Sequence, residues 1–448
     1  MKKLLALVLA LVMTLSLATV SSNAAFNDAN KVKDTYAEAV EVLTGMGVIK
    51  GYADGSFKPE GSITRAEVAA VVYRIYTADV KDKNIGLYAG YSKFDDLTGA
   101  NWAKGYIGYC ANAELVRGYN ATKFGPLDNV TGYQALAMIL RAMGYDKNGE
   151  FTGKDWELHV AQTAQQLGIL KNAGAENLSA PASRQLVAEL FFQAIQKDCV
   201  SYTPAFGYVA NTIVKSEGSL GKKNFGLTKT DASNDKWGRP LYKWTNGKTG
   251  SALVTYATIK ATPVKTYTAA VTECDVAHDA GLKVDTAYTL YVNGDKATTK
   301  YIVNLTDTTT KMGAQGRLIE VYDDTIVMID TFLAKVKSVA EAAYDPQGHL
   351  KTPATIVLSV YDVANTGRNL TLTNGKTNYE YAVGDYVLVN AFTNNNTSKT
   401  SGTVIDNNKA DILGKATSLE GSQSIIYWNA TQHNVEGTIY DDAYKFLL

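Results

Sequence analysis

The sequence has few cysteines, and their pattern is irregular. Only three occur in 448 residues, at Cys110, Cys199 and Cys274. An odd number of cysteines without regular spacing does not form a disulfide framework. Two of them fall on apolar faces of expected helices, where we expect buried thiols.

The chain also lacks an excess of charge of either sign. Lysine and arginine together number 44, and so do aspartate and glutamate. A nucleic-acid-binding protein needs a basic face. The balance therefore predicts no nucleic-acid partner, and the length allows two or three domains.

Long hydrophobic runs are absent except at the N-terminus. Lys2 and Lys3 precede an apolar run from Leu4 to about Val20, and small residues follow it. This order predicts a signal peptide over residues 1–25, with cleavage after Ala24 or one residue later. The alternative is a transmembrane anchor, although the run is short for a span, which needs about 20 apolar residues. We expect no membrane span after cleavage, so retention at a surface would have to be non-covalent.

Two loops in the N-terminal part share one motif, 67 residues apart. The first is Gly51–Pro59 (GYADGSFKP) and the second is Gly118–Pro126 (GYNATKFGP). A threonine follows each loop, with a glutamate or glutamine three residues later: Thr64 with Glu67, and Thr131 with Gln134. That spacing predicts a capping box at the start of a helix. A repeat of fixed period indicates one helix-loop-helix unit used more than once.

Apolar residues at helical spacing extend this pattern over three segments. In the first, they predict a helix over about 35–46, with Gly47 as its C-cap. The third segment keeps the helical pattern, and Ser183 begins its second helix, but its middle loop has lost the Gly-Tyr pair and the phenylalanine. One helix pair cannot bury its apolar face alone. We therefore expect units at residues 26–80, 91–146 and 151–200, packed as one all-α, pseudo-threefold domain.

The loop motif and the sequence Thr64-Arg65-Ala66-Glu67 resemble the S-layer homology (SLH) module, which holds bacterial surface proteins on cell-wall polymers. The resemblance covers about residues 26–199. It implies three SLH modules, the third divergent, in a secreted protein at the cell wall of a Gram-positive-type bacterium. The implied partner is a cell-wall polysaccharide, such as a pyruvylated secondary polymer, and the protein can self-associate in a surface layer.

Arg65 and Arg184 stand at the first helical position, where a cation faces the unfavourable end of the helix dipole. Two explanations remain open from the residues alone. Each arginine reaches back to a carboxylate such as Asp34, Asp54 or Glu67, or each joins free backbone amides in binding an external anion. The resemblance implies the second, because the SLH arginine is taken to grip a carboxylate on the polymer.

The match to the motif extends the implied wall-polymer-binding set to Gly51, Tyr52, Thr64, Arg65, Glu67, Ser183, Arg184 and Trp102. For Trp102 we favour core packing over sugar stacking. The second unit has Gly132 where the arginine should be, and the third has Leu186 in place of the glutamate. We therefore expect the best site in the first groove.

From about residue 204, threonine, valine, tyrosine, asparagine and glycine in short alternating runs predict strands. Four dipeptides predict hairpin turns: Asn246-Gly247, Asn293-Gly294, Asp323-Asp324 and Asn374-Gly375. We expect an all-β region of barrel or sandwich type, divided into modules at residues 204–335 and 336–448.

This region offers little for catalysis. Close carboxylates that could serve a glycosidase are Glu273 with Asp275 and Glu320 with Asp323, but charged strand ends are the commoner explanation. No metal spacing is found around His278, His349 or His433. A calcium loop at Asp231–Asp235 is discounted, because Lys236 replaces the glycine it requires. We predict no catalytic residue, metal or cofactor, and hence no enzyme.

The sequence therefore predicts a secreted surface protein, anchored non-covalently by its SLH units, that displays a β-rich region. Two alternatives stay open. One is an SLH-anchored enzyme acting on extracellular polysaccharide, which needs a cleft with convergent carboxylates. The other is a glycan-binding adhesin, which needs a groove lined by exposed aromatic rings.

Overall fold

The computed structural model describes residues 26–214, 218–268, 271–283, 286–302, 312, 317–361, 367–373, 378–391, 393–394, 403–404, 410–415, 425–429 and 434–439. The predicted signal peptide, His433 and the Asn374-Gly375 turn lie outside these residues. The described residues divide into two compact units. Residues 26–232 with 242–259 form the helical unit, and residues 233–241 with 260–439 form the β-rich unit.

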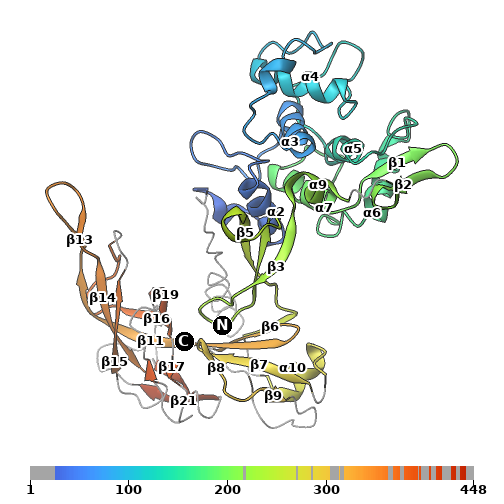
Figure 1. The fold of residues 1–448 in the computed structure, drawn as a ribbon. Coiled ribbons are helices and arrows are strands. Elements are labelled where there is room, and N and C mark those ends of the chain that lie inside the picture. The colour runs from blue at the N-terminus through green and yellow to red at the C-terminus, as the bar shows by residue number, and fades with distance from the viewer. Residues whose placement is uncertain are drawn as a thin grey trace. The chain divides into compact units, whose positions relative to one another are not determined.

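Three successive helix pairs build the helical unit (Figure 1). They are α2 (Asp34–Gly45) and α3 (Arg65–Thr77), α4 (Lys104–Asn112) and α5 (Gly132–Ala142), and α6 (Trp156–Gln166) and α7 (Arg184–Ile195). Short 3-10 helices precede or join them: η1 (Ala29–Lys31), η2 (Ile85–Tyr88) and η3 (Asn101–Ala103). The predicted capping boxes at Thr64 and Thr131 are confirmed, and the Ser183 side chain accepts from the backbone amide of Leu186.

A ring of backbone hydrogen bonds joins the three pairs. It uses the residue before each helix cap, namely Ile63, Val130 and Ala182. The Ile63 amide donates to the Ala182 carbonyl at 3.2 Å, Ala182 donates to Val130 at 2.8 Å, and Val130 donates to Ile63 at 2.9 Å. Each residue gives and receives one bond, so the three segments before α3, α5 and α7 meet in a closed cycle.

The chain after α7 packs against the same core. It contains β1 (Val200–Thr203), β2 (Gly207–Ala210), α8 (Asn211–Val214), α9 (Leu220–Phe225) and a three-stranded sheet of β3 (Thr228–Ala232), β4 (Leu241–Thr245) and β5 (Thr255–Lys260), with η4 (Gly250–Ala252) before β5. Trp244 of β4 contacts Phe192 and donates to Glu38 at 2.7 Å. Cys110 and Cys199 are buried, as predicted. The unit boundary therefore differs from the expected one at residue 204.

The β-rich unit is organised around one long strand, β11 (Thr325–Ala340). Its first half pairs with β10 and, in parallel, with β7; its second half pairs with β14 and β16. The other elements are β6 (Lys265–Tyr267), α10 (Glu273–Asp279), β7 (Ala287–Val292), β8 (Asp295–Lys296), β9 (Tyr301–Ile302), β10 (Arg317–Val321), β12 (Ala343–Tyr344), β13 (Leu350–Thr352), β14 (Thr355–Tyr361), β15 (Gly367–Thr373), β16 (Tyr386–Ala391), β17 (Thr393–Asn394), β18 (Thr403–Val404), β19 (Ala410–Lys415), β20 (Ile425–Asn429) and β21 (Asn434–Ile439).

Two features of this unit differ from the sequence expectation. The largest sheet follows the order β15-β14-β11-β10-β6 with side branches, and the pairings among the described residues do not close a barrel. β11 also crosses the expected division at residue 335 without a break.

The short helices α8, α9 and α10 were not expected, because four to seven residues give too little periodicity to detect.

Two predicted turns are confirmed. Asn293 and Gly294 both have positive φ between β7 and β8, and β10 turns back into β11 around Asp323-Asp324. Asn246-Gly247 instead begins a longer connection that includes η4. Within the described part of the chain, the helices are all too short or too polar to cross a bilayer.

Candidate functional site

Arg184, at the start of α7, inserts into the loop of the first repeat. Its Nε donates to the Phe57 carbonyl at 2.8 Å, and its Nη2 donates to the Lys50 carbonyl at 3.0 Å. The guanidinium carbon lies 4.6 Å from the Tyr52 ring centroid and 5.1 Å from that of Phe57. We call Lys50, Tyr52 and Phe57 the first socket. Arg184 is only 5% exposed within it.

Arg65, at the start of α3, occupies the equivalent place in the second repeat. Its Nε donates to the Phe124 carbonyl and its Nη2 to the Arg117 carbonyl, both at 2.8 Å. The rings of Tyr119 and Phe124 lie 4.6 and 4.7 Å away. Arg117, Tyr119 and Phe124 form the second socket. Arg65 is 4% exposed, and this burial lowers its pKa, although arginine remains protonated.

The two loops are held in the same way by an aspartate near the start of each repeat. Asp28 accepts from the backbone amides of Phe57 and Lys58, both at 2.8 Å. Asp96 accepts from those of Phe124 and Gly125, at 3.0 and 2.8 Å. These bonds fix the carbonyl of each phenylalanine where the incoming arginine meets it.

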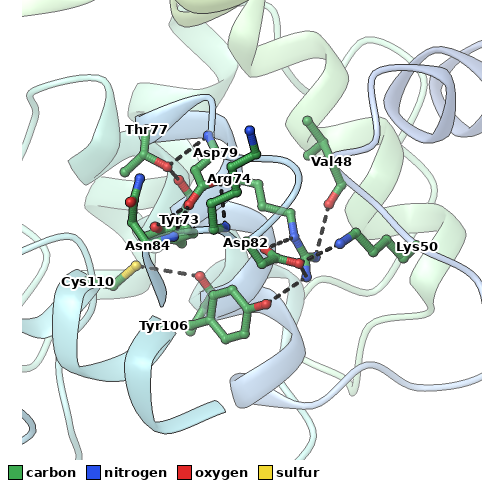
Figure 2. Close-up of polar contacts among 12 residues, drawn as sticks. Val48, Lys50, Tyr73, Arg74, Thr77, Asp79, Asp82, Asn84, Tyr106 and Cys110 are labelled. Atoms are coloured by element: carbon green, nitrogen blue, oxygen red, sulfur yellow. Dashed lines mark hydrogen bonds and ion pairs between the residues drawn. The ribbon is translucent and has the colours of Figure 1, made fainter. Parts of the chain in front are cut away.

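A second aspartate forms an ion pair with the basic residue at the start of each loop, Lys50 in the first and Arg117 in the second. In the first socket, Lys50 pairs with Asp82, which also accepts from Arg74 Nε at 2.8 Å. Figure 2 shows Arg74 between Asp82, the Tyr106 hydroxyl and the Val48 carbonyl. Partial burial would raise the pKa of Asp82, but the hydrogen bonds from Arg74 and Lys50 outweigh it and hold that pKa below its ordinary value.

In the second socket the corresponding aspartate is Asp146, whose side chain is fully buried. Arg141 Nε donates to it at 2.6 Å, and Arg117 Nη2 lies 3.2 Å from the same oxygen. Arg141 follows Arg74 by the same 67 residues that separate the loop motifs. Both aspartates have positive φ, so the two repeats share this strained turn.

The sockets differ in whether a carboxylate pairs directly with the arginine. Glu67 Oε1 lies 3.2 Å from Arg184 Nη1 and accepts from the Tyr52 hydroxyl at 2.9 Å, while its Oε2 closes the capping box with Thr64. The repeat register assigns neutral Gln134 to the position of Glu67, and it forms the capping box of α5 with Thr131. Among the described residues, no acidic side chain forms an ion pair with Arg65. In the first network Arg184, Lys50 and Arg74 form ion pairs with Glu67 and Asp82. In the second, Arg117 and Arg141 form ion pairs with Asp146, while Asp128 hydrogen-bonds to the Tyr119 hydroxyl and attracts Arg65 from a longer distance.

The third junction has no arginine. Gly132 begins α5, and the Tyr133 amide donates to the Leu178 carbonyl of the third loop at 3.1 Å. A Cβ at position 132 would lie 2.7 Å from Leu178 Cδ2 and 3.1 Å from its Cα. The loop and the helix therefore approach too closely for any side chain at this position.

The structure corrects three expectations about the site. The first backbone amides of α3 and α7 bond within the protein. The Arg65 amide donates to the backbone carbonyl of Asp128 and the Arg184 amide to that of Gly61, each at 2.9 Å. They therefore do not converge on an external anion. Gly51 and Tyr52 accompany Arg184 rather than Arg65. Trp102, favoured as a core residue, is 54% exposed and contacts Tyr106 edge-on.

Sequence reasoning missed Arg117, Tyr119 and Phe124 as partners of Arg65. The signal was present in the repeat register, because these residues match Lys50, Tyr52 and Phe57. What the register does not tell is that each arginine enters a loop of a different repeat.

One carboxylate of each pair considered for a glycosidase has a structural partner. Glu320 is buried and lies 2.6 Å from Arg239 Nε, and Asp275 forms a capping box with Thr272 at the start of α10. Among the described residues, no group of three or more potential metal ligands is found.

The helical unit is thus a repeat domain whose segments interlock through arginine sockets and a backbone ring. Residues 25–69 and 93–136 match the family model of the S-layer homology domain. These two ranges contain both sockets and both capping boxes.

Several relatives are similar to part of the chain. The middle cell wall protein of Brevibacillus brevis is 28% identical over 183 residues, which are 40% of this chain and 17% of that protein. The surface layer protein of Brevibacillus choshinensis is 27% identical over 192 residues, 43% of this chain and 16% of that protein. An amylopullulanase of Thermoanaerobacterium thermosulfurigenes is 26% identical over 186 residues, which are 38% of this chain and 9% of that protein.

The chain therefore spans a small fraction of the length of these relatives. Taken together, the S-layer homology domains and the surface-layer relatives support cell-wall anchoring of a surface protein. They also indicate a secreted protein of the cell surface.

Proposed function

We propose that this chain is retained on the cell wall by three SLH modules, at residues 26–80, 91–146 and 151–200, that bind an anionic wall polysaccharide. The closed ring through Ile63, Val130 and Ala182 supports a third module, because it treats all three segments alike. The β-rich unit is then the part displayed at the surface, where it can associate with other copies in a surface layer.

The lack of a direct ion pair to Arg65 among the described residues carries the proposal. Arg65 is held by carbonyls and aromatic rings, whereas Arg184 pairs with Glu67, and Asp128 attracts Arg65 only from a longer distance. At the rim, Tyr119 is 56% exposed and the Arg117 side chain is half exposed. A negative substituent, such as a pyruvate ketal, would balance this charge beside the Tyr119 ring. Arg65 then positions the loop and attracts the anion by its positive charge, while the exposed side chains of Tyr119 and Arg117 contact the anion directly.

Sedimentation of the full chain with purified cell walls tests this function. We expect Arg65→Ala to weaken binding by up to about fivefold, the value of an ion pair near the surface, and the double variant with Arg184→Ala to weaken it further. Lys83→Ala, which removes an exposed cation outside both sockets, is the matched control. Walls stripped of their secondary polymer should no longer retain the chain.

Because both arginines also join repeats, circular dichroism must show that each variant is folded. Undiminished sedimentation of the folded double variant would defeat the proposal. Equal binding to stripped walls would defeat it as well.

We infer a non-enzymatic role. One relative is an amylopullulanase, so an anchored enzyme is the second candidate. One carboxylate of each pair proposed for it already has a structural partner, since Glu320 pairs with Arg239 and Asp275 caps α10. These contacts support a displayed, structural β-rich unit.

A further inference from the structure

A separate hollow lies along α6 in the third repeat, where the arginine socket is missing. Its volume is about 410 Å³, within the usual range for small-ligand sites. Of the residues in the two socket networks it shares only Asp146. Its walls come from α6, from the connection between α5 and α6, and from β2.

One wall of this hollow is aromatic. The rings of Tyr145 and Tyr208 lie 5.2 Å apart, and Phe151 continues the apolar surface. The Tyr208 hydroxyl donates to Glu150 Oε1 at 2.7 Å and accepts from the Lys147 amide at 2.8 Å. These two bonds fix the Tyr208 ring before any ligand arrives.

The opposite wall is a polar row on α6. His159, Gln162, Thr163 and Gln166 recur at helical spacing and so lie on one face. His159 Nδ1 bonds to the Glu150 carbonyl at 2.8 Å, so it donates there and Nε2 is left for a ligand. Gln162 and Gln166 are exposed, and neither side-chain amide forms a hydrogen bond to another described residue. Each amide offers two donors and one acceptor.

We propose that this hollow binds a neutral pyranose sugar. A pyranose has an apolar C–H face, which the tyrosine rings can cover, and a rim of hydroxyls that both donate and accept, which planar amides can pair. The lining contains no lysine or arginine, and its carboxylates, Asp146 and Glu150, are already bonded. An anionic sugar is therefore disfavoured here, in contrast to the sockets. The sugar comes either from a neutral residue of the wall polymer or from another glycan.

Calorimetric titration of the full chain tests the site, with cellobiose, maltose and N,N′-diacetylchitobiose as neutral probes and digalacturonate as the anionic probe. We expect at least one neutral disaccharide to bind with a Kd in the millimolar range or tighter. The double variant Gln162→Ala with Gln166→Ala should bind it about tenfold or more weakly, since two hydrogen bonds are lost. Gln165→Ala, an exposed glutamine of the same helix outside the hollow, should bind as the unchanged chain does.

Failure of all three neutral probes to bind at about 10 mM would overturn the proposal. So would equal binding by the double glutamine variant, or glutamine-dependent binding of digalacturonate. The double variant Arg65→Ala with Arg184→Ala should keep its affinity for the neutral sugar. This result would distinguish sugar binding in the hollow from wall anchoring by the sockets. Competition by the bound disaccharide in wall sedimentation then assigns the source: reduced sedimentation identifies wall glycan, and unchanged sedimentation identifies another glycan.

Discussion

The first and second sockets hold their arginines through the same atoms, yet they differ in charge. Arg184 and Arg65 each bond to two carbonyls and stack on a tyrosine and a phenylalanine. Within the described part of the chain, Arg184 also forms an ion pair, with Glu67, whereas Arg65 forms none and is attracted by Asp128 from a longer distance. Shape and charge are therefore separable in this repeat. Carbonyls and rings are sufficient to hold a buried guanidinium without a direct ion pair.

The third junction extends the comparison. Gly132 brings no side chain to the third loop, yet Ala182 still completes the backbone ring with Val130 and Ile63. The arginine is thus not required to close the ring. At this junction, which has no arginine, the third loop packs directly against the start of α5, and Leu178 lies where a side chain at position 132 would be.

The largest effect is expected from restoring a side chain at this junction. Gly132→Val places a Cβ 2.7 Å from Leu178 Cδ2 and 3.1 Å from its Cα, so side chain and backbone must both shift. We expect a loss of roughly 2–3 kcal/mol in the free energy of unfolding, measured by urea denaturation of the full chain.

Gly86→Val is the control for this prediction, because a Cβ at Gly86 meets nothing within 4 Å. It should change stability by no more than about 0.5 kcal/mol. Adding Leu178→Ala to Gly132→Val should recover part of the loss. Equal stability of the two glycine variants would show that the third junction is not closely packed.

A smaller effect concerns Asp82, which holds the lysine of the first socket. Its pKa is lowered in the folded protein, so its stabilisation is complete above the ordinary aspartate pKa of about 4 and is lost as the pH falls through the lower folded value. Asp82→Asn should therefore cost about 1.5–3 kcal/mol near pH 6. The difference from the unchanged chain should shrink toward about pH 3.

Urea denaturation over that pH range measures this effect. Asp95→Asn is the control, since Asp95 forms an exposed pair with Lys123 and should cost less than about 1 kcal/mol. A cost for Asp82→Asn that does not depend on pH would show that charge plays no part in holding Lys50 and Arg74.

The repeat could be read from the sequence to the level of its helices and caps. Thr64 with Glu67, and Thr131 with Gln134, predicted capping boxes that the structure confirms, because such caps depend on neighbours a few residues away. The partner of Arg65 could not be read in this way. It lies more than 50 residues ahead in the chain, in a loop brought close only by the ring of three repeats.

The β-rich unit shows the same limit. The Asn293-Gly294 turn is local and was predicted, whereas the role of β11 as a strand shared by both halves of the sheet depends on distant partners. The site in α6 is a further case. Gln162 and Gln166 follow no motif, and their importance appears only when β2 brings Tyr208 opposite them.

The smallest and most direct test exchanges Glu67 and its repeat counterpart Gln134. Gln134→Glu adds a carboxylate at the repeat position of Glu67, and Glu67→Gln removes the carboxylate that pairs with Arg184, while both side chains keep the capping box. If wall binding depends on unbalanced positive charge, Gln134→Glu should weaken sedimentation with cell walls by about two- to fivefold, and Glu67→Gln should strengthen it by a similar factor. Both effects should diminish at high salt, because screening weakens interactions between exposed charges. The double exchange should bind much as the unchanged chain does, since it moves the charge from one socket to the other. Equal effects of the two single variants would mean that charge does not distinguish the sockets, and that the polymer is recognised by shape alone.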